Sequence, residues 1–184
     1  MNHDDPDPDP DPSRISVEIS DTQSHLKIDH EAIGKLVRAT LGAEGIDQAA
    51  ISLAIVDNPT IQVINRRHLD HDWPTDVITF PLSDPDEPAL AAELVVSGEM
   101  ASATAREAGV DAWHELALYV VHGLLHVCGH DDRTDDGRAE MRRRESEILA
   151  RAGLTNTFPA VFGPAGTGRE TETTEGRESA RCTA

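Results

Sequence analysis

The chain is poor in aromatic residues, in cysteine and in positive charge. Its 184 residues include two Trp, three Phe, one Tyr and two Cys, and 34 Asp and Glu outweigh 16 Lys and Arg for a net charge of −18. This composition excludes collagen-like, coiled-coil and disulfide-scaffold classes. Two cysteines, one in an apolar stretch and one in a polar segment, fit a reducing cytoplasm better than a structural disulfide.

The sequence also lacks long apolar runs. None approaches 18 residues, and the first residues, MNHDDPDPDPDPS, are acidic where a signal peptide would be basic and then apolar. We therefore expect no membrane span and no signal peptide. The shortage of Lys and Arg also argues, taken alone, against nucleic acid as a partner, because phosphate contacts depend on these residues.

Composition divides the chain into three parts. Residues 1–13 carry a charge of −5 in an Asp-Pro repeat, which can form neither helix nor strand ladder because proline removes donors and the aspartates repel. Residues 155–184 are rich in Gly, Thr and charge, without a period. We predict two disordered tails around one domain, residues 14–154, which carries −12.

Periodicity and capping residues indicate an α+β domain with a small mixed four-stranded sheet and about five helices. The predicted strands are 14–20, 50–56, 75–80 and 93–100. The predicted helices are 30–42, one opened by Asn58-Pro59, 101–108, 112–128 and 136–152.

The segment WHELALYVVHGLLHVC (113–128) is apolar on nearly every face, which predicts a buried helix. Within it, His122 and His126 are four residues apart, so both imidazoles project from one face and can bind one metal ion. Gly129 is suited to end the helix, and a turn through residues 130–132 can return a third ligand. Three protein ligands with an open position are typical of a catalytic zinc site.

Two other metal chemistries are disfavoured by the residues around these histidines. Metalloproteases with the H-E-x-x-H motif place the general base directly after the first histidine, where this chain has Gly123. A protease would need Glu99, Glu115 or Asp131 as a substitute. Cys128 faces away from the histidines around the helix, so a closed structural site is also disfavoured.

Four blocks, in the expected order, resemble the YbeY family. The stretch HGLLHVCGHDD (122–132) resembles the family signature H-G-x-L-H-x-x-G-[YF]-D-H. The other blocks are Ile64-Asn65 followed by DWPTDVITFP (72–81), Gly98-Glu99-Met100 followed by Ser102, and a helix with Met141, Glu145 and Leu149. The resemblance spans about residues 14–154 and implies a zincin-like metal helix.

YbeY proteins are bacterial rRNA-maturation factors and single-strand-specific metallo-endoribonucleases. The resemblance therefore implies a cytoplasmic zinc-dependent hydrolase, with one Zn ion per chain or another divalent metal. It implies single-stranded rRNA as substrate, the ribosome or ribosomal proteins as partners, and roles in small-subunit rRNA 3′-end maturation and ribosome quality control. The alternatives are a ribosome assembly factor with a structural metal and a metal hydrolase of another substrate class.

The third metal ligand departs from the family pattern. The family usually has His where this chain has Asp132. Aspartate is a competent zinc ligand, although its charge makes harder ions such as Mn more competitive. Because Asp132 keeps the register of the turn, we predict His122, His126 and Asp132 as the ligands, with His130 as the rival third ligand.

The substrate-binding residues are less well defined. The family usually has N-x-x-Y-R, whose arginine falls at Leu69. Arg66 or Arg67 could replace it, but their side chains point elsewhere around the helix, and solvated cations on a helix face are the simpler interpretation. Thr75 is a candidate substrate contact at the start of a strand, although such residues are commonly turn formers. His114 either supports the metal site or faces solvent.

The acidic charge finally predicts how RNA is bound. A metal ion supplies local positive charge that residue counting omits. With −12 on the domain and few aromatics for base stacking, we expect weak, salt- and magnesium-sensitive activity on free RNA, with partners supplying recognition.

Overall fold

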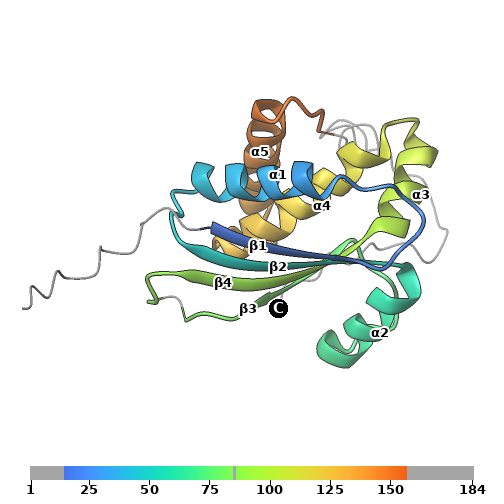
Figure 1. The fold of residues 1–184 in the computed structure, drawn as a ribbon, viewed down its shortest axis with the longest axis horizontal. Helices are drawn as coiled ribbons and strands as arrows, with labels where there is room; N and C mark the ends of the chain where they lie inside the picture. The colour runs from blue at the N-terminus through green and yellow to red at the C-terminus, as the bar shows by residue number, and fades with distance from the viewer. Residues whose placement is uncertain (1–14, 85, 157–184) are drawn as a thin grey trace, which may run out of the picture.

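A computed structural model describes residues 15–84 and 86–156 (Figure 1). In chain order, its elements are β1 (Ile15–Asp21), α1 (His30–Ala43), β2 (Ala49–Val56), α2 (Asn58–Leu69), β3 (Val77–Pro81), β4 (Leu90–Ser97), α3 (Gly98–Ala108), α4 (Ala112–Val127) and α5 (Asp135–Arg151).

The sheet has the strand order β1-β2-β4-β3. β1, β2 and β4 are mutually parallel, and β3 pairs antiparallel with β4 at one edge. Helices α1 and α4 lie on one face with α5 outside them, and α2 lies on the opposite face (Figure 1). The predicted α+β domain, with a mixed four-stranded sheet and five helices, is confirmed for the described residues.

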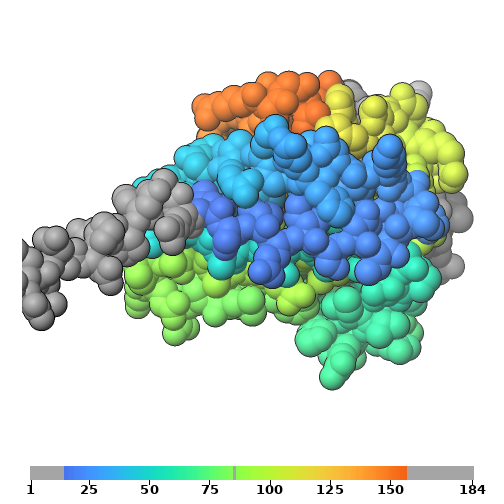
Figure 2. All heavy atoms as spheres, viewed as in Figure 1, coloured from blue at the N-terminus to red at the C-terminus, as the bar shows by residue number. Residues whose placement is uncertain are grey.

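Helix α4 is the centre of the main core. It begins where the Asp111 side chain accepts a hydrogen bond from Trp113 N–H at 2.8 Å, and every residue from Glu115 to Leu125 is buried. The helix is apolar on all sides because it packs between the sheet, α1 and α5. Helix α5 carries the charge instead and forms part of the outer surface (orange in Figure 2).

Gly123 allows α4 to lie close to the sheet. A Cβ atom at this position would be 2.9 Å from the Val77 Cγ2, 3.0 Å from the Leu94 Cδ2 and 3.2 Å from the Thr79 Cγ2. These separations are shorter than normal carbon contacts, so a larger residue would push the helix off β3. The residue that replaces the protease glutamate therefore has a packing role.

The predicted boundary between β4 and α3 is wrong. The strand predicted at 93–100 runs instead from Leu90 to Ser97, and Gly98-Glu99-Met100 is the first turn of α3. The reason is a helix cap, because the Ser97 hydroxyl accepts a hydrogen bond from Met100 N–H at 3.0 Å. The cap turns the chain into a helix directly after the apolar run.

The predicted tails lie largely outside the described residues, as do residue 14 and Cys182. At the C-terminal boundary, Thr155 N–H donates to the His114 Nδ1 at 3.4 Å and the Asn156 amide donates to the Ser146 hydroxyl at 2.8 Å. Within residues 15–84 and 86–156, no helix has both the length and the apolarity needed to cross a bilayer.

Candidate metal centre

His122 and His126 face each other on the buried side of α4. His122 is 2% exposed, and its Nδ1 lies 2.7 Å from the Glu145 Oε1 on α5. The His126 Nδ1 lies 2.9 Å from the carbonyl oxygen of His130. Since a carboxylate and a carbonyl can only accept, both Nδ1 atoms carry the proton in neutral rings, and both Nε2 atoms keep a lone pair.

The two Nε2 atoms are only 3.0 Å apart. Two lone pairs at this distance repel each other unless a cation lies against both. Burial, followed by the neighbouring His122, lowers the pKa of the His126 imidazole, which favours its neutral, metal-binding form. The donor set and its tautomers therefore fit a divalent metal ion.

Asp132 completes the group. A ligand atom from each of His122, His126 and Asp132 lies within 4.8 Å of the other two. The loop that presents Asp132 is held by Arg138, whose guanidinium donates to the carbonyls of Asp132 at 3.0 Å and Arg133 at 3.2 Å. The structure thus brings the three predicted ligands together.

The turn after α4 follows from Gly129, as the sequence indicated. Its φ of 95° is in the left-handed region that favours glycine. Gly129 N–H donates to the His126 carbonyl at 2.9 Å, and His130 N–H donates to the Leu125 carbonyl at 3.0 Å. This pair of bonds is a Schellman motif, and it aims the following loop back toward the histidines.

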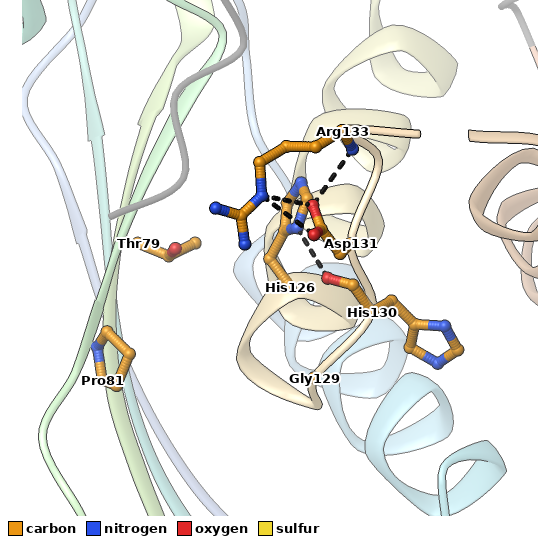
Figure 3. A pocket seen from close by; sticks show the side chains of 7 residues that line it. All are labelled: Thr79, Pro81, His126, Gly129, His130, Asp131 and Arg133. Atoms are coloured by element: carbon orange, nitrogen blue, oxygen red, sulfur yellow. Dashed lines mark hydrogen bonds and ion pairs between the residues drawn. The ribbon is translucent and has the colours of Figure 1, made fainter. Parts of the chain in front are cut away.

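The side chain of His130 is directed away from His126 (Figure 3). Its Nε2 lies 2.7 Å from the Glu44 Oε2, and Arg144 also binds Glu44. Burial opposes ionisation of Glu44, but the hydrogen bonds from His130 and Arg144 outweigh it and lower its pKa. An anionic Glu44 holds the ring of the rival ligand, so this geometry favours Asp132.

An open cavity lies between the end of α4 and β3. It is lined by Thr79, Pro81, His126, Gly129, His130, Asp131 and Arg133 (Figure 3). The Arg133 side chain is 81% exposed, and its Nε donates to both carboxylate oxygens of Asp131 at 3.0 and 2.9 Å. Sequence reasoning missed Arg133, because no motif marks it and only the turn brings it to the cavity.

The proposed substitutes for a protease base lie elsewhere or are engaged. Glu115 is 1% exposed and two turns before His122. Glu99 accepts a hydrogen bond from Asn58 N–H at 2.9 Å. Asp131 borders the cavity, but its carboxylate is already bound by Arg133. The hydrogen bond from Arg133 N–H is the main cause of the lowered pKa of Asp131, and the Arg133 side chain binds the same carboxylate.

Cys128 and His114 do not contribute ligands to the described group. Burial, followed by the charge of Glu44, raises the pKa of the Cys128 thiol to about 12. His114 is about 12 Å along the helix axis from His122 and accepts a hydrogen bond from Thr155 N–H.

Neither Thr75 nor Leu69 is among the residues that line the described cavity. Thr75 is 4% exposed and its hydroxyl donates to the Asp76 Oδ1 at 2.9 Å. The same oxygen accepts from Val77 N–H, so β3 begins at Val77 rather than at residue 75. Leu69 packs against the small apolar cluster under α2. Arg66 and Arg67 are exposed at the end of α2, and Thr75 as a substrate contact stays a prediction.

Comparison with known proteins decides the family. Residues 18–153 match the family model described as Endoribonuclease YbeY. The chain belongs to the YbeY endoribonuclease family. A YbeY protein of Carboxydothermus hydrogenoformans is 36% identical over 140 residues, which cover 74% of this chain and 97% of that relative. A YbeY protein of Rhodopirellula baltica is 43% identical over 118 residues, 63% of this chain and 60% of that one.

The fold also has a solved counterpart. The solution structure of a Thermotoga maritima protein is 21% identical and matches with a TM-score of 0.53, over 83% of this chain and 100% of that one. The YbeY resemblance and the predicted fold are therefore confirmed, and with them the predicted endoribonuclease function in rRNA processing. This YbeY chain keeps the histidine pair of the predicted signature and supplies Asp132 at its end.

Proposed function

We propose that this endoribonuclease cleaves single-stranded rRNA with one zinc ion bound by His122, His126 and Asp132. The observation that carries the proposal is the pair of Nε2 lone pairs facing each other at 3.0 Å beside the Asp132 carboxylate. When bound, the metal supplies Lewis acidity and lowers the pKa of a coordinated water. Three protein ligands leave a position open to water or to a phosphoryl oxygen.

The chain's own residues position this chemistry. Glu145 and the His130 carbonyl fix the tautomers and ring orientations of the two histidines. Arg138 holds the loop that presents Asp132. The cavity beside His126 is open, bordered by β3 on one side and by the loop after α4 on the other, and it can admit an unpaired RNA strand.

We further propose that Arg133 binds a substrate phosphate. Only its Nε is engaged by Asp131, so its terminal NH groups project from a residue that lines the cavity. A guanidinium offers paired donors that match phosphate oxygens. This role would meet the need for a cation near the site, because Leu69 offers none and the domain is strongly acidic.

The ligand assignment is tested by Asp132→Ala and His130→Ala. We expect His130→Ala to retain about one metal ion per chain, and Asp132→Ala to lose most of its metal and its RNA cleavage, because a three-ligand site is reduced to two. Metal analysis of the purified variants, followed by a single-stranded RNA cleavage assay, measures both. Asp132→His is expected to keep the metal. Loss of metal from His130→Ala with retention in Asp132→Ala would reverse the assignment.

The phosphate role is tested by Arg133→Ala. We expect cleavage of single-stranded RNA to fall about 10- to 100-fold, because a charge-assisted hydrogen bond to phosphate contributes roughly 1.5–3 kcal/mol. Metal content should stay unchanged. Arg151→Ala, an exposed arginine at the far end of α5, is the matched control and should behave as wild type. Equal activity of the two variants would rule out the proposed contact.

The ribosome or its proteins remain the proposed partner in recognition. The support is electrostatic, because a chain of −18 repels free RNA except near its metal and its few cations. The alternative of an assembly factor with a purely structural metal requires a closed shell, normally of four protein ligands. The group of three described here does not favour it.

A further inference from the structure

The loop between α2 and β3 carries two stacked rings that the metal chemistry does not use. The rings of His71 and Trp73 have centroids 4.7 Å apart and an interplanar angle of 17°. Trp73 is 42% exposed. The other tryptophan, Trp113, is partly buried and packs against the core. A chain with so few aromatics therefore places one of its two largest on the surface.

The backbone under this pair is fixed to α2. The Asn65 side-chain amide, which is fully buried, donates to the Trp73 carbonyl at 2.8 Å. The Gln62 amide donates to the Asp72 carbonyl and to its Oδ1, both at 3.1 Å. A rigid aromatic surface loses little conformational entropy when a flat ligand stacks on it.

Two arginines precede the ring pair, and the loop itself adds Asp70 and Asp72, so the charges of these four residues balance. Arg66 and Arg67 are exposed in the last turn of α2, directly before this loop. Arg66 lies 3.7 Å from Asp72 in an exposed pair, and Arg67 forms no ion pair within the part of the chain that the structure describes. Flat aromatic surfaces flanked by arginine are typical of sites that bind single-stranded nucleic acid.

The edge of β3 joins this loop to the metal centre. Trp73 lies four residues before β3, and Thr79 on β3 lines the cavity that contains His126. The six residue steps from Trp73 to Thr79 span at most about 20 Å. Two hydrogen bonds fix which residues of β3 bond to β4: Ser97 N–H donates to the Asp76 carbonyl, and Leu82 N–H donates to the Ala91 carbonyl. In an antiparallel pair, alternate residues bond to the partner strand, so the N–H and C=O groups of Thr79 point to the open edge of the sheet. Helix α2 protrudes beside this edge (teal in Figure 2).

We propose that Trp73, supported by His71, is a platform on which a nucleobase of single-stranded RNA stacks while the neighbouring nucleotides follow the edge of β3 to the metal centre. This inference rests on the proposed function and adds a binding site to it. Stacking needs no net positive charge, so it suits an acidic enzyme. It also selects single strands, because bases inside a duplex are not free to stack on a side chain.

The two tryptophans make binding directly measurable. In Trp113→Phe, Trp73 is the sole tryptophan, and its fluorescence should be quenched by a 2′-O-methyl oligoadenylate of about 12 nucleotides. By anisotropy of the labelled oligonucleotide, Trp73→Ala should bind about tenfold more weakly, since one stacked base contributes on that scale. Trp73→Phe should stay within about threefold, because a ring is kept. A matching duplex should bind weakly to all.

The same proteins separate this platform from the proposed chemistry. Trp73→Ala should raise the KM for single-stranded RNA about tenfold with kcat little changed. His122→Ala should lose cleavage, but the oligonucleotide should still quench its Trp73 fluorescence. A wild-type protein that binds but does not cleave would overturn the proposed chemistry and leave the platform standing. Unchanged binding by Trp73→Ala, or a defect confined to binding of ribosomal subunits, would overturn the platform while cleavage stands.

Discussion

Replacing His122 by alanine is expected to remove the bound metal and to lower RNA cleavage by more than about 1,000-fold. His122 is one of the three proposed ligands, so its removal leaves only two protein groups to hold the metal. The loss should appear mainly in kcat, because the metal acts on the reacting phosphate. Metal analysis and single-turnover cleavage of a labelled single-stranded RNA measure the two effects together.

His114→Ala is the matched control for this variant. It removes a histidine from the same helix at a position that contacts Thr155 instead of the metal group. We expect wild-type metal content and cleavage from it. Circular dichroism of both variants checks that α4 still forms. Cleavage that persists in metal-free His122→Ala would refute metal-assisted catalysis.

Glu145→Gln is expected to weaken metal binding by about 10- to 100-fold, as for other residues that hydrogen-bond to a metal ligand and fix its orientation. Glu145 is fully buried, and its Oε1 accepts the hydrogen bond from His122 Nδ1 at 2.7 Å. An amide can still accept this bond, but it carries no negative charge to make the imidazole a stronger donor to the metal. Competition with a fluorescent zinc chelator measures the affinity.

Glu145→Gln should weaken metal binding but should not destabilise the metal-free protein. The Glu145 Oε2 has no hydrogen-bond partner among the described residues, and a buried carboxylate with an open oxygen is costly. We expect the thermal midpoint of metal-free Glu145→Gln to equal or exceed that of the wild type. Glu140→Gln, on the exposed side of the same helix, should change neither quantity. A large loss of stability in Glu145→Gln would mean that the carboxylate holds the fold instead of the metal.

The ligand pair and its turn could be predicted because their geometry is local. Two histidines four residues apart on an apolar helix have a fixed relation, and Gly129 adopts the positive φ that its position implied. The third ligand was predicted from the register of the turn, and the structure places Asp132 beside the pair. The sequence could not show that the His130 ring contacts Glu44, because Glu44 is 86 residues away in the chain.

Other features depended on tertiary contacts or on competing local signals. The end of β4 was misjudged because the apolar run gives no sign that Ser97 caps a helix. Arg133 reaches the cavity only after the chain reverses at Gly129. The stacked pair of His71 and Trp73 was hidden, since residues two apart contact each other only once the loop is bound to α2.

All three proposed ligands come from residues 122–132, and Glu145 lies only 23 positions beyond His122. In folding terms, the centre is a low-contact-order unit, because its assembly closes one short loop and adds one packed helix. The parallel ladder between β1 and β2 has to join residues 34 positions apart in sequence. The metal centre can therefore take shape from α4 and α5 before the slower pairing of the sheet is complete.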